Sequence, residues 1–349
     1  MRLQPALFPA LLPLGAVCFY WTSGTETSPA DRRSNFSPSQ ISSIEQEAHG
    51  MLPNAALPSS ISQDSLISLQ LIAFNEIFEV AFFTELLFNL TNNVDGYELS
   101  DDNGESIIES ILTIQNQEEL HALQANQLLE YFGTNPIQPC NYSFPVSNLR
   151  EAIWHASLFT SVNLGTMQDV TRIFADSGDT SLIQVLTSII GQEGEQEGFF
   201  RIIQQKLPSE VPFLTASVRE FTFTALRSHV IPGSCSHLDA IHLKTFAPLN
   251  LITTPVAETE IIQFSYPNQT YYGDLFAVYI NQQNLPIVEA IGVNDVKDYA
   301  VNAEALFPYN ANEMNGLTIM TLTNSPGPFI DAREVAKSTL FGPAFIIVN

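Results

Sequence analysis

Basic residues are scarce in this sequence. Lysine and arginine number 13 against 37 aspartates and glutamates, which gives a formal net charge of −24 at pH 7. A protein of this sign repels nucleic-acid phosphates and anionic membrane surfaces, so we expect neither as a partner. Common catalytic signatures are missing as well, because the sequence shows no phosphate-binding loop, no Ser-His-Asp arrangement and no zinc-ribbon spacing of cysteines.

Cysteine is also rare, with Cys18, Cys140 and Cys235 as the only three. Cys18 lies within residues 1–20, where Arg2 precedes an apolar stretch that prolines interrupt. This stretch is too short and too broken for a good membrane span, and it predicts a secretory signal peptide. Loss of the signal would leave two cysteines in an oxidising compartment, so we predict a disulfide between Cys140 and Cys235 in a secreted protein.

Residues 21–63 are rich in serine and proline and predict an irregular N-terminal arm, in which Arg32-Arg33 is a candidate processing site. Four Asn-X-Ser/Thr sequons are consistent with glycosylation of a secreted chain. They begin at Asn35, Asn89, Asn141 and Asn268.

Apolar residues recur at spacings of three and four over residues 64–249, which predicts a helical bundle without a stable membrane insertion. The expected helices cover residues 64–90, 105–132, 148–175, 179–207 and a fifth segment, 213–230. The first of them is apolar nearly all round, so we expect it at the centre. The fourth contains Gly191, Gly194 and Gly198, which are costly in a helix and which we expect to permit close helix approach.

Polar residues interrupt the apolar seams of three of these helices, each near its midpoint. They are Glu76 on the first helix, Glu118 and His121 on the second, and Glu193 and Gln196 on the fourth. Midpoints of antiparallel helices meet at one level, so the sequence predicts one polar layer in the core. A buried carboxylate without a partner is expensive, so this layer needs a metal, a proton or an ion pair.

Two interpretations of this layer remain open. Three carboxylates and one imidazole suit a single Mn, Fe or Zn ion. Alternatively, a protonated His121 neutralises one carboxylate, Gln196 donates to another and a third holds a proton, so that the layer is satisfied without metal.

Other ionisable and aromatic residues are expected outside the site. We expect Glu79 to lie beside the layer or to be exposed to solvent. We expect the side chains of Glu195 and Glu197 to be exposed. Packing roles are expected for Trp154 and His155, and capping or surface roles for His229 and His237.

The pattern changes after about residue 250. Short runs with a period of two or continuous apolar character alternate with Asn, Gly and Pro, and they predict a small β-rich, sandwich-like domain over residues 250–349. The fold class is therefore α+β. This domain has neither a metal-ligand cluster nor a nucleophile motif, so a binding or structural role is expected.

From about residue 40 to the C-terminus, the sequence resembles a fungal family of secreted ferritin-like proteins, described as late sexual development or stress-response proteins. The stretches that carry the resemblance are Leu52 to Pro58, Asn75 to Phe83, Glu118-Glu119-Leu120-His121, Pro139 to Pro145, Glu193 to Arg201, Ser234-Cys235 and Gly342-Pro343-Ala344.

The resemblance implies a ferritin-like bundle followed by a β-rich tail. The wider superfamily holds two Fe or Mn ions with a Glu on helix one, Glu-x-x-His on helix two, a Glu on helix three and Glu-x-x-His on helix four. The matching residues here are Glu76, Glu118, His121 and Glu193. Gln196 replaces the last His, and no acid stands at 160–162 on the third helix, so the resemblance does not extend to a two-metal centre.

Together these observations predict a secreted ferritin-like protein of fungal development or stress response. We expect it to be non-catalytic, with a degenerate metal site and with extracellular or cell-wall proteins or polysaccharides as partners. The alternative is a metal-dependent oxidase or peroxide-handling enzyme that uses one Fe or Mn ion at the carboxylate and histidine site.

Overall fold

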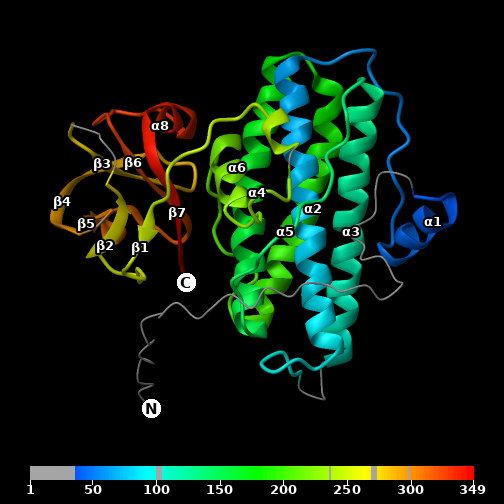
Figure 1. Cartoon of the computed structure of the whole chain (residues 1–349), viewed down its shortest axis with the longest axis horizontal. Coiled ribbons are helices and arrows are strands. Elements are labelled where there is room, and N and C mark those ends of the chain that lie inside the picture. Colours follow the sequence, from blue (N-terminus) through cyan, green and yellow to red (C-terminus); the bar gives the residue numbers. More distant parts are fainter. Residues whose placement is uncertain (1–35, 100–103, 236, 269–272, 298) are drawn as a thin grey trace.

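The computed structural model describes residues 36–99, 104–235, 237–268, 273–297 and 299–349. A helical part and a β-rich part lie next to each other (Figure 1). The predicted signal peptide, Arg32-Arg33 and the sequon at Asn35 lie outside the described residues.

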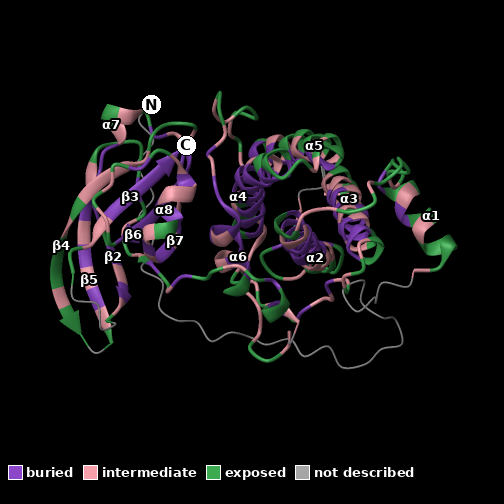
Figure 2. Ribbon diagram, turned by 90° about the horizontal axis from the view of Figure 1, so that it is seen from above, coloured by how far each residue is buried: buried purple, intermediate pink, exposed green. Residues whose placement is uncertain are grey.

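Four long helices form the bundle: α2 (Gln63–Thr91), α3 (Gly104–Tyr131), α4 (Leu149–Asp176) and α5 (Ile183–Ile203), the last preceded by the short helix η2 (Thr180–Leu182). The predicted helix positions are confirmed within a few residues, and the fifth helix, α6 (Arg219–Arg227), is shorter than expected. It is followed by η3 (Leu238–Ala240). Figure 2 shows the buried faces of the long helices turned towards one another.

Helix α2 is buried along most of its length, as its nearly uniform apolar character predicted. The side chain of Ser62 caps its N-terminus by accepting a hydrogen bond from the backbone N–H of Ser65. By length and composition α2 is the one helix of the described chain that could cross a membrane, but 83% of its most apolar stretch is buried inside the bundle. It is therefore a core helix.

The predicted irregular arm contains a helix in its described part. Helix α1 (Pro38–Glu47) begins with Pro38 after a capping box formed by Ser37 and Gln40, a local signal that the sequence analysis did not use. Ile44 of α1 is buried against Leu120 and Leu123 of α3. The arm thus covers the outer face of α3.

The C-terminal strands form one antiparallel seven-stranded sheet instead of the predicted sandwich, in the order β1-β2-β5-β4-β3-β6-β7. Their bounds are β1 Asn250–Leu251, β2 Glu260–Pro267, β3 Phe276–Asn281, β4 Ile287–Lys297, β5 Ala300–Phe307, β6 Gly316–Thr323 and β7 Thr339–Val348. Strand β4 is long enough to pair with β3 along its first half and with β5 along its second, which keeps the sheet continuous. The sheet curls, since Ala247, just before β1, forms a parallel bridge with Phe341 of β7.

The sheet and the bundle share a hydrophobic cluster, although residue 250 was the predicted boundary between them. Two short helices accompany the strands, α7 (Tyr309–Asn312) and α8 (Ala332–Ser338). The shared cluster, here called the docking cluster, includes Val162 of α4, Phe221 of α6, Val278 of β3, Ile319 of β6 and Val335 of α8. Arg333 of α8 also pairs with Asp169 of α4. The bundle and the sheet are therefore joined through a packed interface that combines apolar contacts with an ion pair.

Candidate metal centre in the bundle core

The predicted polar layer is present in the bundle. Four of its side chains, here called the core tetrad, each bring one ligand atom within 4.8 Å of the others: Glu76 from α2, Glu118 and His121 from α3, and Glu193 from α5. The three glutamates are 0% exposed. The His121 side chain is 15% exposed and is the only member of the tetrad that reaches solvent.

His121 lies between two carboxylates. Its Nδ1 is 2.9 Å from Oε2 of Glu118 and 3.5 Å from Oε2 of Glu76. The side-chain amide of Gln196 donates to Oε1 of Glu118 from the opposite helix, so this sequence-predicted residue is also part of the layer. Among the described residues, neither carboxylate oxygen of Glu76 accepts a hydrogen bond of normal geometry. A buried group of this kind requires a proton or a cation.

Two further residues belong to this layer, one of which the sequence analysis missed. Asn163 of α4 donates from Nδ2 to both oxygens of Glu193, at 3.0 and 3.1 Å. It stands one residue beyond positions 160–162, where the resemblance to ferritin-like proteins places an acid on the third helix. Glu79 is fully buried, which excludes the solvent-exposed interpretation. Its Oε1 accepts from Asn75 at 2.9 Å, whereas its Oε2 has no partner in the described chain.

The prediction for Glu197 was wrong. Glu195 is exposed as expected, but Glu197 is 4% exposed and its Oε1 accepts from the hydroxyl of Ser157 at 2.7 Å. Four residues after Glu193, it lies on the same face of α5 and packs towards α4. Burial raises the pKa of Glu197 to about 8.

The surroundings of His155, His229 and Trp154 agree only in part with the roles that the sequence predicted. His155 is buried among Phe82, Phe159 and His229, which confirms its packing role. His229 takes part in the same aromatic group instead of lying on the surface. Trp154 is 42% exposed and contributes little to the core.

The electrostatics of the layer follow from burial and from the one imidazole. Burial raises the pKa of Glu76 to about 7 and raises the pKa values of Glu79 and Glu193 well above their usual range. Burial acts in the same direction on Glu118, but the charge and hydrogen bond of His121 outweigh it and lower the pKa of that carboxyl. Burial opposes the charge on His121, yet Glu118 and Glu76 raise its pKa to about 10.

The layer therefore combines the ion pairs of His121 with carboxyls whose affinity for a proton is raised by burial, and a metal cation can take the place of such protons. The carboxylate oxygens of Glu76 and the side-chain oxygen of Gln196 accept no hydrogen bond in the described chain, so they are available as metal ligands. A second ion does not fit the residues present. Asn163 and Gln196 present N–H groups to the carboxylates at the places where a two-metal centre needs further ligands.

The family model of the ferritin-like domain matches residues 68–206, which cover most of α2 to α5. The predicted ferritin-like bundle is thereby confirmed, and the chain contains a ferritin-like domain with a carboxylate and histidine cluster in its core. The match ends before the sheet. No curated protein matches the chain.

Proposed function

We propose that the ferritin-like domain of this protein binds one transition-metal ion through the core tetrad. The observation that carries this proposal is the meeting of three helices at one point, where three buried carboxylates and one imidazole converge. An imidazole among carboxylates suits Mn, Fe or Zn better than Ca or Mg. When bound, an Fe or Mn ion supplies redox chemistry to the site.

The remaining residues of the layer orient the ligands. Gln196 holds Glu118 and Asn163 holds Glu193, so neither carboxylate rotates freely. Such indirect contacts commonly affect metal affinity about 10- to 100-fold. The complete burial of the glutamates excludes bulk water, and His121 faces the only solvent-exposed side of the tetrad.

Elemental analysis of the chain, purified without chelators, tests this proposal. We expect about one Mn, Fe or Zn ion per chain from a donor set of this kind. In Glu118→Gln the bound metal is lost because the variant removes a carboxylate ligand. Glu195→Gln, an exposed change on α5, retains it.

The result that contradicts the proposal is a chain that stays free of metal even after reconstitution. In that case the layer is a structural network of protons and hydrogen bonds. Glu118→Gln would then lower the free energy of unfolding, because it leaves His121 without its closest counter-charge.

Metal-dependent oxidation is a second candidate function. It is favoured by the partial exposure of His121, which is the tetrad side chain that a molecule as small as oxygen or peroxide can contact from solvent. The assay is Fe(II) oxidation under oxygen by the reconstituted chain. Oxidation no faster than in buffer eliminates this candidate and leaves the metal-binding proposal intact.

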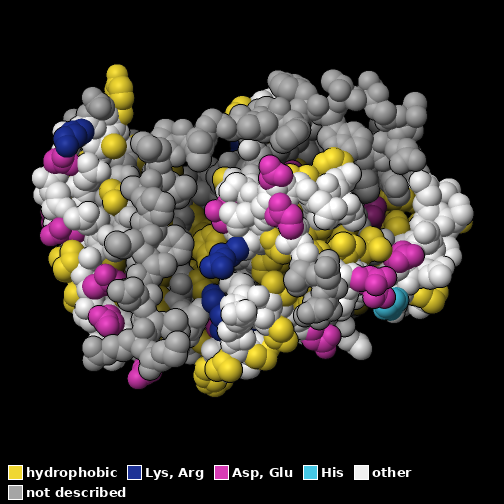
Figure 3. Space-filling view, turned by 90° about the horizontal axis from the view of Figure 1, so that it is seen from below, with side chains coloured by type: hydrophobic (Ala, Val, Ile, Leu, Met, Phe, Trp, Pro, Cys, Tyr) yellow, Lys and Arg dark blue, Asp and Glu magenta, His cyan; other side chains and the backbone are white. Residues whose placement is uncertain are grey.

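We further propose that the protein is secreted and acts in fungal development or stress response, with extracellular or cell-wall proteins or polysaccharides as partners. The predicted signal peptide and the Cys140–Cys235 disulfide support secretion. The sequon residues Asn141 and Asn268 are exposed, whereas Asn89 is half-buried on α2. Acidic side chains are scattered over the face shown in Figure 3. Binding to a wall fraction should be tested with the whole chain because the sheet shares the docking cluster with the bundle.

A further inference from the structure

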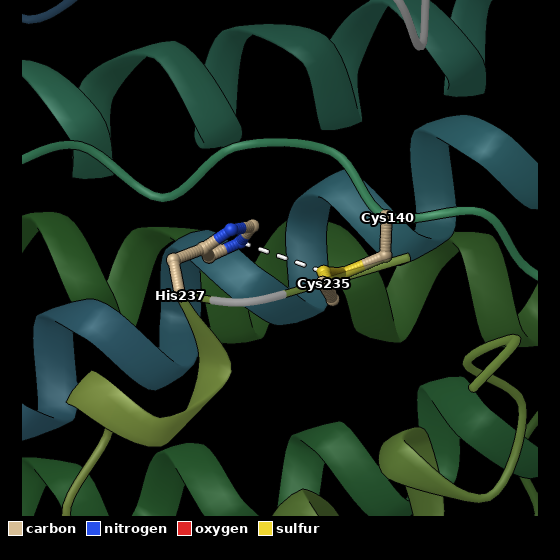
Figure 4. A group of neighbouring side chains, drawn as sticks. All are labelled: Cys140, Cys235 and His237. Carbon is tan, nitrogen blue, oxygen red and sulfur yellow. Dashed lines mark hydrogen bonds between the residues drawn. A yellow bond between two sulfur atoms is a disulfide. The ribbon is translucent and has the colours of Figure 1, made fainter. Parts of the chain in front are cut away.

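His237 lies beside the disulfide between Cys140 and Cys235 (Figure 4). Nε2 of His237 is 3.6 Å from Sγ of Cys235. Together with Cys140, these residues form the cysteine–histidine cluster, whose ligand atoms all lie within 4.8 Å of one another. Cys140 is buried, and the other two are partly exposed, so the cluster is accessible from solvent on one side.

We propose that the cysteine–histidine cluster binds one Zn²⁺ ion when the disulfide is reduced. Two thiolates and one imidazole form a ligand set that zinc accepts, with a water molecule completing a tetrahedron. This second metal site is independent of the core tetrad and is controlled by the redox state of the two cysteines.

Backbone pairing keeps the two cysteines together without the S–S bond. Ile231 N–H donates to the carbonyl of Asn141 at 2.8 Å, and Ser143 N–H donates to the carbonyl of His229 at 2.8 Å. The N–H of Asn141 also donates to the hydroxyl of Ser234 at 3.2 Å. These bonds join the segment that contains Cys140 to the segment that leads to Cys235.

The cysteine side chains have room to rearrange around an ion. Their Cα atoms are 5.2 Å apart. Zinc–sulfur bonds of about 2.3 Å in a tetrahedron place two sulfur atoms roughly 3.8 Å apart. Rotation about the two Cα–Cβ bonds supplies this separation while the paired backbone stays in place.

The orientation of His237 is also that of a metal ligand. Nε2 of His237 faces the sulfur atom of Cys235, and the backbone of Gln138 lies against the same ring. Histidines that bind metals commonly use one ring nitrogen for such a backbone contact, which fixes the ring and leaves the other nitrogen for the metal. His237 is therefore held in place before an ion arrives.

Formation of the site is a two-step reaction. A phosphine reductant donates an electron pair to the S–S bond and takes up the oxygen of one water molecule, whose two protons yield two thiols. Zn²⁺ then binds two thiolates and the neutral imidazole, and the two thiol protons pass to solvent. The Cys140–Cys235 disulfide is the two-electron oxidant in the first step, and the phosphine leaves as its oxide.

The experiment is a Zn²⁺ titration of the full chain before and after phosphine reduction, in competition with a chromogenic chelator. We expect one additional equivalent of zinc after reduction. In His237→Ala the affinity of this additional equivalent falls about 10- to 100-fold or more. His242→Ala, an exposed histidine five positions along the chain, leaves it unchanged. Replacing Zn²⁺ with Co²⁺ gives a thiolate-to-metal charge-transfer band, which the carboxylate and histidine ligands of the core tetrad do not produce.

Three outcomes overturn the proposal. They are equal zinc binding by the oxidised and reduced chains, equal affinity in His237→Ala and wild type, and a reduced chain that unfolds and does not refold on addition of zinc. Circular dichroism of each state detects the last of these. The core tetrad contains no sulfur, so the thiolate-to-metal band is the same whether or not the tetrad binds a metal ion. The two metal proposals can therefore fail separately.

Discussion

Two carboxamides limit the set of ligands that the bundle core offers to a metal ion. Asn163 and Gln196 each stand where a two-metal centre needs another ligand, and each donates a hydrogen bond to a tetrad carboxylate instead. Their N–H groups repel a cation at the positions where a carboxylate or an imidazole would attract it. The chemistry of the core thus depends on residues that carry no charge.

The double variant Asn163→Glu/Gln196→His should bind about two metal ions where the wild type binds one, because it supplies the missing carboxylate and imidazole. Without metal it should melt at a lower temperature, since it buries an additional carboxyl. Mn²⁺ at about 100 times its dissociation constant should restore about 2.7 kcal/mol for each ion bound. Elemental analysis and thermal melts measure both effects.

Asn163→Gln is the matched control for this variant, because it lengthens the side chain while keeping the amide. It should still bind one ion. A folded double variant that also binds one ion would contradict the assignment of the two carboxamides.

Glu197 should make the stability of the protein depend on pH. Its pKa is about 8 in the folded state against 4.5 as the reference value, so the folded state binds more protons between these values. The free energy of unfolding should therefore fall as pH rises from 4.5 to 8, by up to about 1.4 kcal/mol per pH unit. Glu197→Gln, which is neutral at all pH values, should reduce this slope by the contribution of one carboxyl.

Urea unfolding at pH 5, 6, 7 and 8 measures the slope. Glu195→Gln is the control, because Glu195 is exposed on the same helix. Equal slopes for Glu197→Gln and the wild type would show that Glu197 is ionised in the folded protein.

Among the elements, α4 approaches a neighbouring segment so closely that only glycine fits. A Cβ atom at Gly165 would lie 2.4 Å from the backbone carbonyl of Thr215. The adjacent N–H of Ser217 donates to the carbonyl of Gly165 at 3.3 Å, and Thr215 in turn donates from its hydroxyl to the carbonyl of Leu317 on β6. The segment that contains Thr215 and Ser217 therefore connects α4 of the bundle to β6 of the sheet.

Gly165→Ala should therefore destabilise the chain by about 1–3 kcal/mol, with the upper end favoured because a backbone carbonyl must move. Gly191→Ala and Gly194→Ala provide controls in α5. No atom lies within 4 Å of a Cβ at either position, so the expectation that they permit close helix approach was wrong. Each should stabilise the protein by about 0.5–1 kcal/mol through helix propensity. Denaturant unfolding compares the three variants.

At the scale of the whole molecule, the bundle and the sheet should unfold together. The docking cluster buries residues from α4, α6, β3, β6 and α8, so separation of the two parts exposes apolar surface on both. We expect one transition in calorimetry, with equal calorimetric and van't Hoff enthalpies.

Phe221→Ala tests this cooperativity. Phe221 is fully buried in the docking cluster and packs against Phe246, so its truncation should cost about 3–5 kcal/mol. The whole transition should move to lower temperature without splitting. Phe213→Ala is the control, because Phe213 is 63% exposed and its truncation should have little effect. Two separate transitions in the wild type would show that the sheet is an independent domain.

The sequence alone determined the features that depend on local pattern. Apolar spacing located α2 to α5, because a buried helix face repeats every three to four residues whatever it packs against. The same spacing revealed the core tetrad and Gln196, since a charged residue in an apolar seam stands out without any structure. The capping box of α1 was also a local signal, so that helix was within reach of the sequence.

Only the tertiary structure decided which distant residues meet. Asn163 is an unremarkable amide in the sequence and becomes part of the site only because α4 places it against Glu193. Glu197 is buried because α4 covers its side of α5. The curled sheet and the docking cluster depend on pairings between residues far apart in the chain, whose free energies arise from contact and desolvation and leave no period in the sequence.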